Sequence, residues 1–265
     1  MSASADPPFV AIVTGAARRI GAAIARRLAG EGVSVVLHTS AASKKDAEAE
    51  AERIRASGGN AIVVDCDLVN SDAAGILFGA AERAFGPVTL LVNNAALFEP
   101  DRAEDFSPAL FDRHIAVNLR TPLLLAQEMW RRLPQDREAA IINIVDQRVS
   151  RPNPTYFTYS VAKTALWSAT ITMAQAFAPK IRVNAIAPGP VLPNVHDGAE
   201  AFAAEVAALP LKRGASAEDV CDAVTYLARA RSVTGQLIAV DGGQHIAWET
   251  PDVLALSRRS ADGGS

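Results

Sequence analysis

The sequence predicts an α/β protein with a doubly wound parallel sheet of seven strands in a single domain. Short apolar runs alternate along the chain with segments of helical pattern, which is typical of repeated strand–helix units. Most of these runs are apolar throughout, as expected for strands that helices cover on both faces. No linker-like stretch divides the chain, and 265 residues are enough for one domain with a sizeable core.

The expected strands coincide with the apolar runs, and the expected helices fill the segments between them. The first strand leads into a glycine-containing turn, and the first helix follows directly. In chain order we expect strand 9–14, helix 20–29, strand 33–38, helix 44–56, strand 61–65, helix 72–85, strand 89–93, helix 109–133, strand 140–145, helix 159–178, strand 182–187, helix 217–228 and strand 236–240.

Residues 190–211 form a longer segment between two of the strands. The segment opens with two prolines and turns helical around residues 199–209, which favours a substrate loop or lid. We expect the domain to span residues 9–248. Residues 1–8 are expected to be a disordered arm, and residues 249–265 a C-terminal tail with a disordered end.

Composition excludes several classes of function. The chain is 49% apolar and 21% charged, with a net charge of −3, so it lacks the basic footprint of a nucleic-acid or anionic-membrane binder. No apolar run approaches the roughly 20 residues of a membrane span, and the start lacks the layout of a signal peptide. Cys66 and Cys221 have no metal-ligand spacing, and we expect buried thiols in a cytoplasmic protein that binds no metal.

The turn between the first strand and the first helix has the features of a phosphate site. It runs from Thr14 through Gly15 to Gly21, and glycines there let backbone amides approach a phosphate at a helix N-terminus. The usual pattern also has glycine at position 19, where this chain has Arg19. An ordinary strand–helix turn is the alternative interpretation.

The end of the second strand favours NADPH over NADH. An NAD site needs a carboxylate here for the ribose hydroxyl, and the next acid in the chain is Asp46. Hydroxyl and basic groups stand there instead, and they suit a 2′-phosphate. The relevant residues are Arg18, Thr39, Ser40, Ser43, Lys44 and Lys45. The alternative for the two lysines is that they begin a solvated helix.

Two further strand ends carry candidate cofactor contacts. Asp67 follows the third strand, where it either bonds the adenine amino group or caps the next helix. Asn94 and Ala95 follow the fourth strand, where small residues let the chain pass close under a cofactor. His38, His114 and His245 have no convergent partners in the sequence, which favours structural roles for their rings.

Asp146, Tyr159 and Lys163 form a possible catalytic group. Tyr159 and Lys163 are four residues apart, so one face of a helix presents both side chains. A nearby ammonium is expected to lower the pKa of the tyrosine and to make it a proton donor near neutral pH. Asp146 stands at the end of an apolar run, where the alternative is a cap for the following loop.

These features together resemble the short-chain dehydrogenase/reductase family over about residues 8–247. The resemblance implies a seven-stranded Rossmann sheet, an NADPH cofactor and a homotetramer. It makes Tyr159 the general acid/base and Lys163 the ligand of the nicotinamide ribose, and it gives Asn118 the support of a water path behind Lys163. The matching elements are Thr14-Gly15 with Gly21, Asp67-Leu68, Asn93-Asn94-Ala95, Asn118, Tyr159 with Lys163, Asn184, Pro188-Gly189, Thr234-Gly235 and Asp241-Gly242-Gly243.

The resemblance also assigns the cofactor contacts. Pro188, Gly189 and Val191 are placed by the nicotinamide carboxamide. The complete expected cofactor set is Gly15, Arg18, Arg19, Ile20, Gly21, His38, Thr39, Ser40, Asp67, Leu68, Asn94, Ala95, Tyr159, Lys163, Pro188, Gly189 and Val191.

One departure from the family pattern narrows the expected substrate. The family normally has serine where this chain has Asp146, and together with Arg19 this resembles the pteridine and dihydromonapterin reductases. In that subgroup the aspartate works with the tyrosine, the arginine reaches towards the pterin and a cofactor phosphate, and an aromatic residue matching Phe98 stacks on the pterin. Residues 194–197 also resemble a loop of the dihydromonapterin enzymes. Plain packing for Phe98 and a phosphate-only role for Arg19 are the alternatives.

The expected function is therefore NADPH-dependent reduction of a pterin, of the dihydromonapterin, dihydrobiopterin or dihydrofolate type. Hydride addition to a C=N carbon needs a proton on the nitrogen, which an Asp146–Tyr159 pair can deliver. The expected substrate contacts are Arg19, Phe98, Asp146 and Tyr159. The alternatives are a carbonyl reductase for a 3-oxoacyl thioester or sugar ketone, and a non-catalytic NADP(H)-binding regulator.

Overall fold

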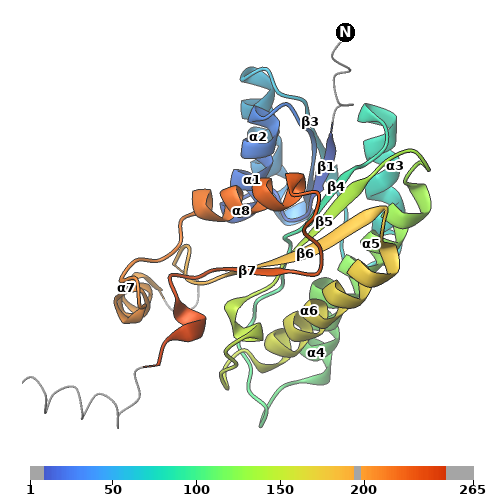
Figure 1. The fold of residues 1–265 in the computed structure, drawn as a ribbon. Coiled ribbons are helices and arrows are strands. Elements are labelled where there is room, and N and C mark those ends of the chain that lie inside the picture. Colours follow the sequence, from blue (N-terminus) through green and yellow to red (C-terminus); the bar gives the residue numbers. More distant parts are fainter. Residues whose placement is uncertain (1–8, 194–197, 249–265) are drawn as a thin grey trace, which may run out of the picture.

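The computed structural model describes residues 9–193 and 198–248, and within them a seven-stranded sheet forms the centre of the molecule (Figure 1). The strands are β1 Val10–Val13, β2 Ser34–Thr39, β3 Ala61–Asp65, β4 Leu90–Asn93, β5 Ala139–Ile144, β6 Ile181–Pro188 and β7 Leu237–Val240. Their order is β3-β2-β1-β4-β5-β6-β7, and every pairing is parallel. The predicted doubly wound sheet is confirmed, with each strand end within one residue of its expected place.

Helices cover both faces of the sheet. They are α1 Arg19–Gly30, α2 Lys44–Ala56, α3 Ala73–Phe85, α4 Pro108–Ile115, α5 Thr121–Arg132, α6 Phe157–Phe177, α7 Gly198–Ala208 and α8 Ala217–Arg229. None of the helices in the described ranges is long and apolar enough to cross a membrane.

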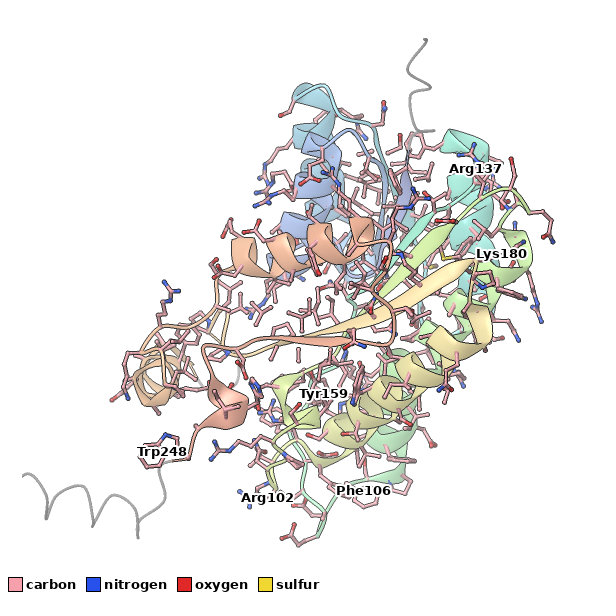
Figure 2. The ribbon with its side chains drawn as sticks, in the orientation of Figure 1. Arg102, Phe106, Arg137, Tyr159, Lys180 and Trp248 are labelled. Atoms are coloured by element: carbon pink, nitrogen blue, oxygen red, sulfur yellow. The ribbon has the colours of Figure 1, made fainter. Side chains whose placement is uncertain are left out.

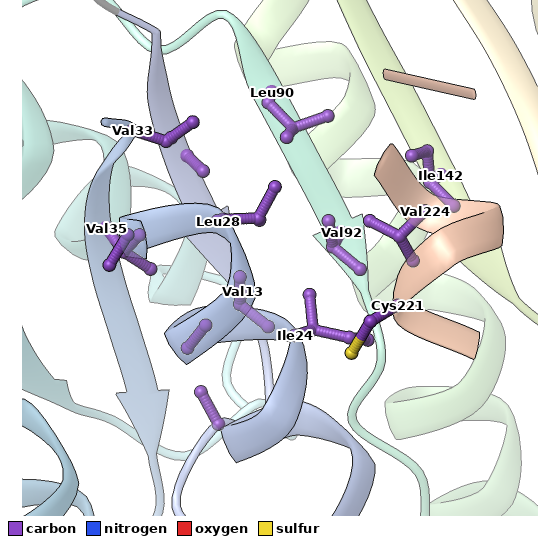
Figure 3. Packing of buried hydrophobic residues seen from close by; sticks show 14 of the residues in the cluster. Val13, Ile24, Leu28, Val33, Val35, Leu90, Val92, Ile142, Cys221 and Val224 are labelled. Atoms are coloured by element: carbon purple, nitrogen blue, oxygen red, sulfur yellow. The ribbon is translucent and has the colours of Figure 1, made fainter. Parts of the chain in front are cut away.

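Two large apolar cores hold these layers together, and a smaller cluster of Val145, Leu166, Ala185 and Ala187 lies between β5, β6 and α6. On one face, Ile24 and Leu28 of α1 and Val224 of α8 pack on strand residues such as Val13 and Val92 (Figure 3). On the other face, α3, α5 and α6 pack against the same central strands. Central strands such as β1 and β4 contribute side chains to both cores, which accounts for their continuous apolar runs.

The expected helix 109–133 is present as one continuous helical stretch, which contains a π-helical turn that the sequence pattern did not predict. The chain forms α4, then a π-helical turn η2 at Ala116–Arg120, and then α5. Asn118 lies within η2, where its amide accepts from the Leu97 N–H and donates to the Leu97 carbonyl, both at 2.9 Å. The widened turn therefore aims a buried polar side chain at the segment that follows β4, a position where π-turns often mark functional sites.

Some expectations concern residues outside the described ranges. They are the arm 1–8, the loop 194–197 that contains His196, and the tail 249–265. The helix expected near 199–209 is present as α7.

Candidate active site

The order of the strands reverses between β1 and β4, and a cavity of about 1120 Å³ opens at the carboxyl ends of the strands there. Ligands of doubly wound sheets bind in this crevice. Figure 2 shows Tyr159 in the first turns of α6, beside this end of the sheet. The cavity brings together eleven of the residues expected from the sequence, namely Arg18, Arg19, Ile20, Asn94, Phe98, Asp146, Tyr159, Lys163, Pro188, Gly189 and Val191.

The glycine turn has no room for side chains at its two ends. Gly15 has a φ of +65°, and a Cβ there would lie 2.9 Å from Ala95 Cα. A Cβ on Gly21 would lie 2.2 Å from the Gly15 carbonyl oxygen. Such close backbone packing is the cradle that a dinucleotide pyrophosphate needs at the N-terminus of α1.

Arg19 stands where glycine is usual, and it adopts the backbone conformation of a glycine. Its φ is +54°, in the left-handed region that side chains rarely occupy. Its guanidinium donates to the carbonyls of Pro193 at 3.0 Å and Leu192 at 3.3 Å. The arginine thus links the glycine turn to the segment that leads towards α7.

Buried polar groups fix the glycine turn to the sheet. The Gly15 N–H donates to His38 Nδ1 at 3.0 Å, so the other ring nitrogen carries the hydrogen and donates to the Cys66 carbonyl at 3.1 Å. Burial lowers the pKa of His38, which suits this neutral form. The Asn94 amide donates to the Thr14 carbonyl at 2.9 Å. The His38 ring is therefore engaged with the protein itself, and its role is to position the turn.

A basic corner lies beside the end of β2. Arg18 donates to Ser43 Oγ at 2.6 Å and pairs with Asp46 at 3.3 Å, while Lys44 pairs with Asp65 at 3.7 Å. The Arg18 and Lys44 side chains are more than half exposed, so these ion pairs contribute little and can be exchanged for a phosphate.

Asp67, the expected adenine contact, accepts a hydrogen bond within its own turn. Asp67 Oδ1 accepts from the Val69 N–H at 2.9 Å and closes a tight turn, and Leu68 beside it is buried. This turn follows β3 next to the basic corner.

The three expected catalytic residues meet at the carboxyl end of β5. The Tyr159 hydroxyl donates to Asp146 Oδ2 at 3.0 Å. Lys163 donates to the Ile144 carbonyl at 2.7 Å, and its Nζ lies 5.8 Å from the centre of the Tyr159 ring. Tyr159 and Lys163 are both buried.

The expected lowering of the Tyr159 pKa by Lys163 is wrong. Burial and then the negative charge of Asp146 raise the pKa of Tyr159 well above its usual value, and only Arg148 opposes them. Burial lowers the pKa of Lys163 to about 8. Tyr159 therefore keeps its proton at neutral pH and donates it in a hydrogen bond to the Asp146 carboxylate.

An aromatic cluster forms the wall beside Tyr159. The ring of Phe98 stacks on the ring of Tyr156 with centroids 4.0 Å apart and planes at 5°, and it meets Tyr159 edge-on at 4.7 Å. One face of Phe98 is thus covered by Tyr156. Phe98 lies in the cavity wall, as the sequence suggested, within a larger aromatic assembly.

Sequence reasoning missed Arg148. This residue lies in the short 3-10 turn η3, Gln147–Val149, and its guanidinium pairs with Asp146 Oδ2 at 3.2 Å. The available signal was its place two residues after Asp146 in a loop that must turn sharply before α6. The cavity wall also contains Phe202 and Glu205 of α7, which sequence reasoning did not single out.

The other histidines have the structural partners that were expected. His114 is buried and lies 2.6 Å from Thr158 Oγ1, and His245 lies 2.7 Å from Asp241 Oδ2. Among the residues that the structure describes, no three His, Cys, Asp or Glu side chains gather in a way that could hold a metal ion.

This site defines an oxidoreductase with a dinucleotide crevice and a tyrosine–lysine pair. Residues 15–245 match the family model described as enoyl-(acyl carrier protein) reductase. The chain belongs to the short-chain dehydrogenase/reductase family, which confirms the resemblance seen in the sequence.

Individual relatives differ in what they are reported to do. An uncharacterised oxidoreductase of Methylorubrum extorquens is 38% identical over 242 residues, covering 88% of this chain and 96% of its own. A 3-oxoacyl-[acyl-carrier-protein] reductase FabG of Staphylococcus epidermidis is 31% identical over 241 residues, covering 89% and 98%.

A solved structure is more similar. FolM alternative dihydrofolate reductase 1 from Brucella suis, in complex with NADP, is 50% identical with a TM-score of 0.89, and the match covers 92% of this chain and 98% of that one.

Proposed function

We propose that this protein is an NADPH-dependent reductase of a pterin, of the dihydromonapterin, dihydrobiopterin or dihydrofolate type. The observation that carries the proposal is the hydrogen bond from the Tyr159 hydroxyl to Asp146 at 3.0 Å. A carboxylate at this position repels a developing oxyanion, whereas it is compatible with proton delivery to a ring nitrogen. The 50% identity to a dihydrofolate reductase from Brucella suis supports the same substrate class.

NADPH is the cofactor that the crevice fits. The close packing of the glycine turn requires glycine at positions 15 and 21, and it supports a pyrophosphate site at the N-terminus of α1. Arg18, with Ser43 and Lys44 beside it, supplies the positive charge that a 2′-phosphate requires. The solved structure from Brucella suis was determined with NADP.

Tyr159 and Lys163 are the groups that supply the proton for the reduction. NADPH, when bound, supplies the hydride to the carbon of a C=N group. Tyr159 keeps its proton until the neighbouring nitrogen gains electron density, because burial raises the pKa of its hydroxyl. Lys163, whose pKa lies at about 8, can then return a proton to the phenolate.

The cavity wall suits a flat heteroaromatic ring. Phe98 lines the cavity together with Tyr159 and Arg19, so a planar substrate can lie against an aromatic edge while its polar rim faces charged groups. The volume of about 1120 Å³ is large enough to hold both a nicotinamide and a pterin.

The test is NADPH oxidation by the purified protein with a panel of substrates. We expect turnover with at least one of 7,8-dihydromonapterin, 7,8-dihydrobiopterin and dihydrofolate. Turnover confined to 3-oxoacyl thioesters or simple ketones would reject the pterin assignment and favour a carbonyl reductase, which the 31% identity to FabG keeps as the second candidate. Binding of NADPH without any turnover would favour a regulatory role.

We also propose a cytoplasmic homotetramer, as the family resemblance implies. Trp130 of α5 is 42% exposed and stacks on Phe177 of α6, and Val161 and Ile171 expose further apolar surface on α6. Burial of such a surface against a second copy is favourable. Sedimentation equilibrium tests it, and a monomer at micromolar concentration would reject it.

A further inference from the structure

Arg148 is a charged residue of the cavity wall to which the reaction chemistry so far gives no role. Its backbone N–H donates to Asp146 Oδ1 at 2.9 Å, and its guanidinium donates to Asp146 Oδ2 at 3.2 Å. Both side chains are only 16% exposed. A charge removed this far from water needs a partner, so the two residues form a semi-buried ion pair.

The second feature is that one carboxylate oxygen has two donors. Asp146 Oδ2 accepts from Arg148 and also from the Tyr159 hydroxyl at 3.0 Å. With the Arg148 N–H on the other oxygen, three donors converge on Asp146. This arrangement suits the ionised carboxylate, which accepts on both oxygens and donates none.

Aromatic rings hold the guanidinium in place. Its central carbon lies 5.5 Å from the Phe98 centroid and 5.3 Å from the Tyr156 centroid. Because those rings are stacked 4.0 Å apart, a group almost equidistant from both lies beside the stack and not over either face. The rings therefore restrict the direction in which Arg148 can point more than they attract its charge.

We propose that Arg148 is a positioning residue that keeps the Asp146 carboxylate paired while Tyr159 gives its proton to the substrate. This inference rests on the proposed reductase function. When the Tyr159 O–H bond breaks and the substrate N–H bond forms, the phenolate is left beside a carboxylate that has lost one donor. Arg148 remains on the same oxygen and supplies the positive charge between two anions. Lys163 contacts Asp146 through neither oxygen, since its Nζ donates to Ile144.

The electrostatics of Tyr159 agree with this geometry. The negative charge of Asp146 raises the pKa of the tyrosine, and the positive charge of Arg148 lowers it. The carboxylate orients the hydroxyl but opposes phenolate formation, and the arginine offsets that opposition. A chain with serine in place of Asp146 would have no charge to offset, so the two residues form one functional unit.

The experiment is a double-mutant cycle with Arg148→Met and Asp146→Asn, measured as single-turnover NADPH oxidation with the best pterin substrate. Loss of a hydrogen bond to a charged group costs about 10- to 100-fold in rate, and we expect a fall of that size in Arg148→Met alone. In the Asp146→Asn background, the same change should cost under about 3-fold, because no carboxylate remains to be paired. The dissociation constant of NADPH should stay within about 2-fold throughout.

Two additions separate charge from shape. Guanidinium ions added to Arg148→Ala should restore part of the rate, whereas Arg102→Met, which removes an exposed arginine from a loop outside the cavity, should match the wild type (Figure 2). An unchanged rate in Arg148→Met, or an equal fall in both backgrounds, would overturn the inference. If the wild type reduces only a carbonyl compound, the pterin proposal fails, and the same cycle run on that compound still decides the role of Arg148.

Discussion

Substitution of Gly21 by alanine is the sharpest test of the nucleotide crevice. The added Cβ would lie 2.2 Å from the Gly15 carbonyl oxygen and 2.5 Å from Asn94 Nδ2. Ordinary contact begins near 3.4 Å, so the turn must shift by about 1 Å. That shift acts on the Asn94 amide, which donates to the Gly15 carbonyl at 3.2 Å.

The cost can be estimated from these contacts. Forcing a methyl group into a filled site destabilises by about 1–3 kcal/mol. Gly30 is the matched control, because it belongs to the same helix and its Cβ would meet nothing within 4 Å. Gly30→Ala should gain about 0.5–1 kcal/mol from the restricted unfolded chain. The two variants should therefore differ by about 1.5–4 kcal/mol in the free energy of unfolding.

The assays are urea denaturation and a fluorescence titration with NADPH. We expect Gly21→Ala to unfold at lower urea and to bind NADPH at least about 10-fold more weakly, since a displaced turn cannot present its amides to the pyrophosphate. Gly30→Ala should bind like the wild type. Equal affinity and equal stability in the two variants would refute the packing argument.

Three other substitutions test separate parts of the site. Asp146→Ser should lower pterin turnover by about 10-fold or more with NADPH affinity little changed, measured by steady-state kinetics and titration; full pterin activity would remove Asp146 from the mechanism. Arg18→Glu should weaken NADPH by about 10-fold and leave NADH within about 2-fold, and an equal effect on both would place Arg18 away from the 2′-phosphate. Lys163→Met tests how stability depends on pH. Burial lowers the Lys163 pKa from 10.5 to about 8, so between these pH values the unfolded chain binds a proton that the folded chain does not. The lysine therefore destabilises the fold less as the pH rises through this range. From pH 8 to 10 the wild type should gain about 2 kcal/mol relative to Lys163→Met in urea denaturation, and parallel curves would contradict the buried ammonium.

The fold could be predicted closely because its pattern is local. Strands of a parallel sheet that are buried on both faces form continuous apolar runs, and runs such as those of β1 and β5 can be recognised in the sequence. The π-helical turn η2 was not predicted, because the apolar periodicity of residues 109–133 does not reveal it. A local signal was present in Pro122, which has no backbone N–H to donate and stands directly after this turn.

The grouping of Asp146, Tyr159 and Lys163 could be predicted from the sequence, and the electrostatics of the group could not. Tyr159 and Lys163 are four residues apart, a spacing that places both side chains on the same face of a helix. Asp146 precedes Tyr159 by thirteen residues in the sequence. The direction of the Tyr159 pKa depends on burial and on the sum of nearby charges, which no spacing reveals. Arg148 affects the pKa of Tyr159 because the short turn η3 places its guanidinium against Asp146.

Two residues at the starts of helices share a left-handed backbone conformation. Arg19 and Tyr156 both have a φ of +54°, directly before or at the start of α1 and α6. Such a conformation costs on the order of 1–3 kcal/mol and persists where the surroundings hold it. Arg19 is held by two carbonyls of the segment before α7, and Tyr156 by its stack on Phe98. Arg19 therefore links the start of α1 to the segment before α7, and Tyr156 links the start of α6 to Phe98 in the cavity wall.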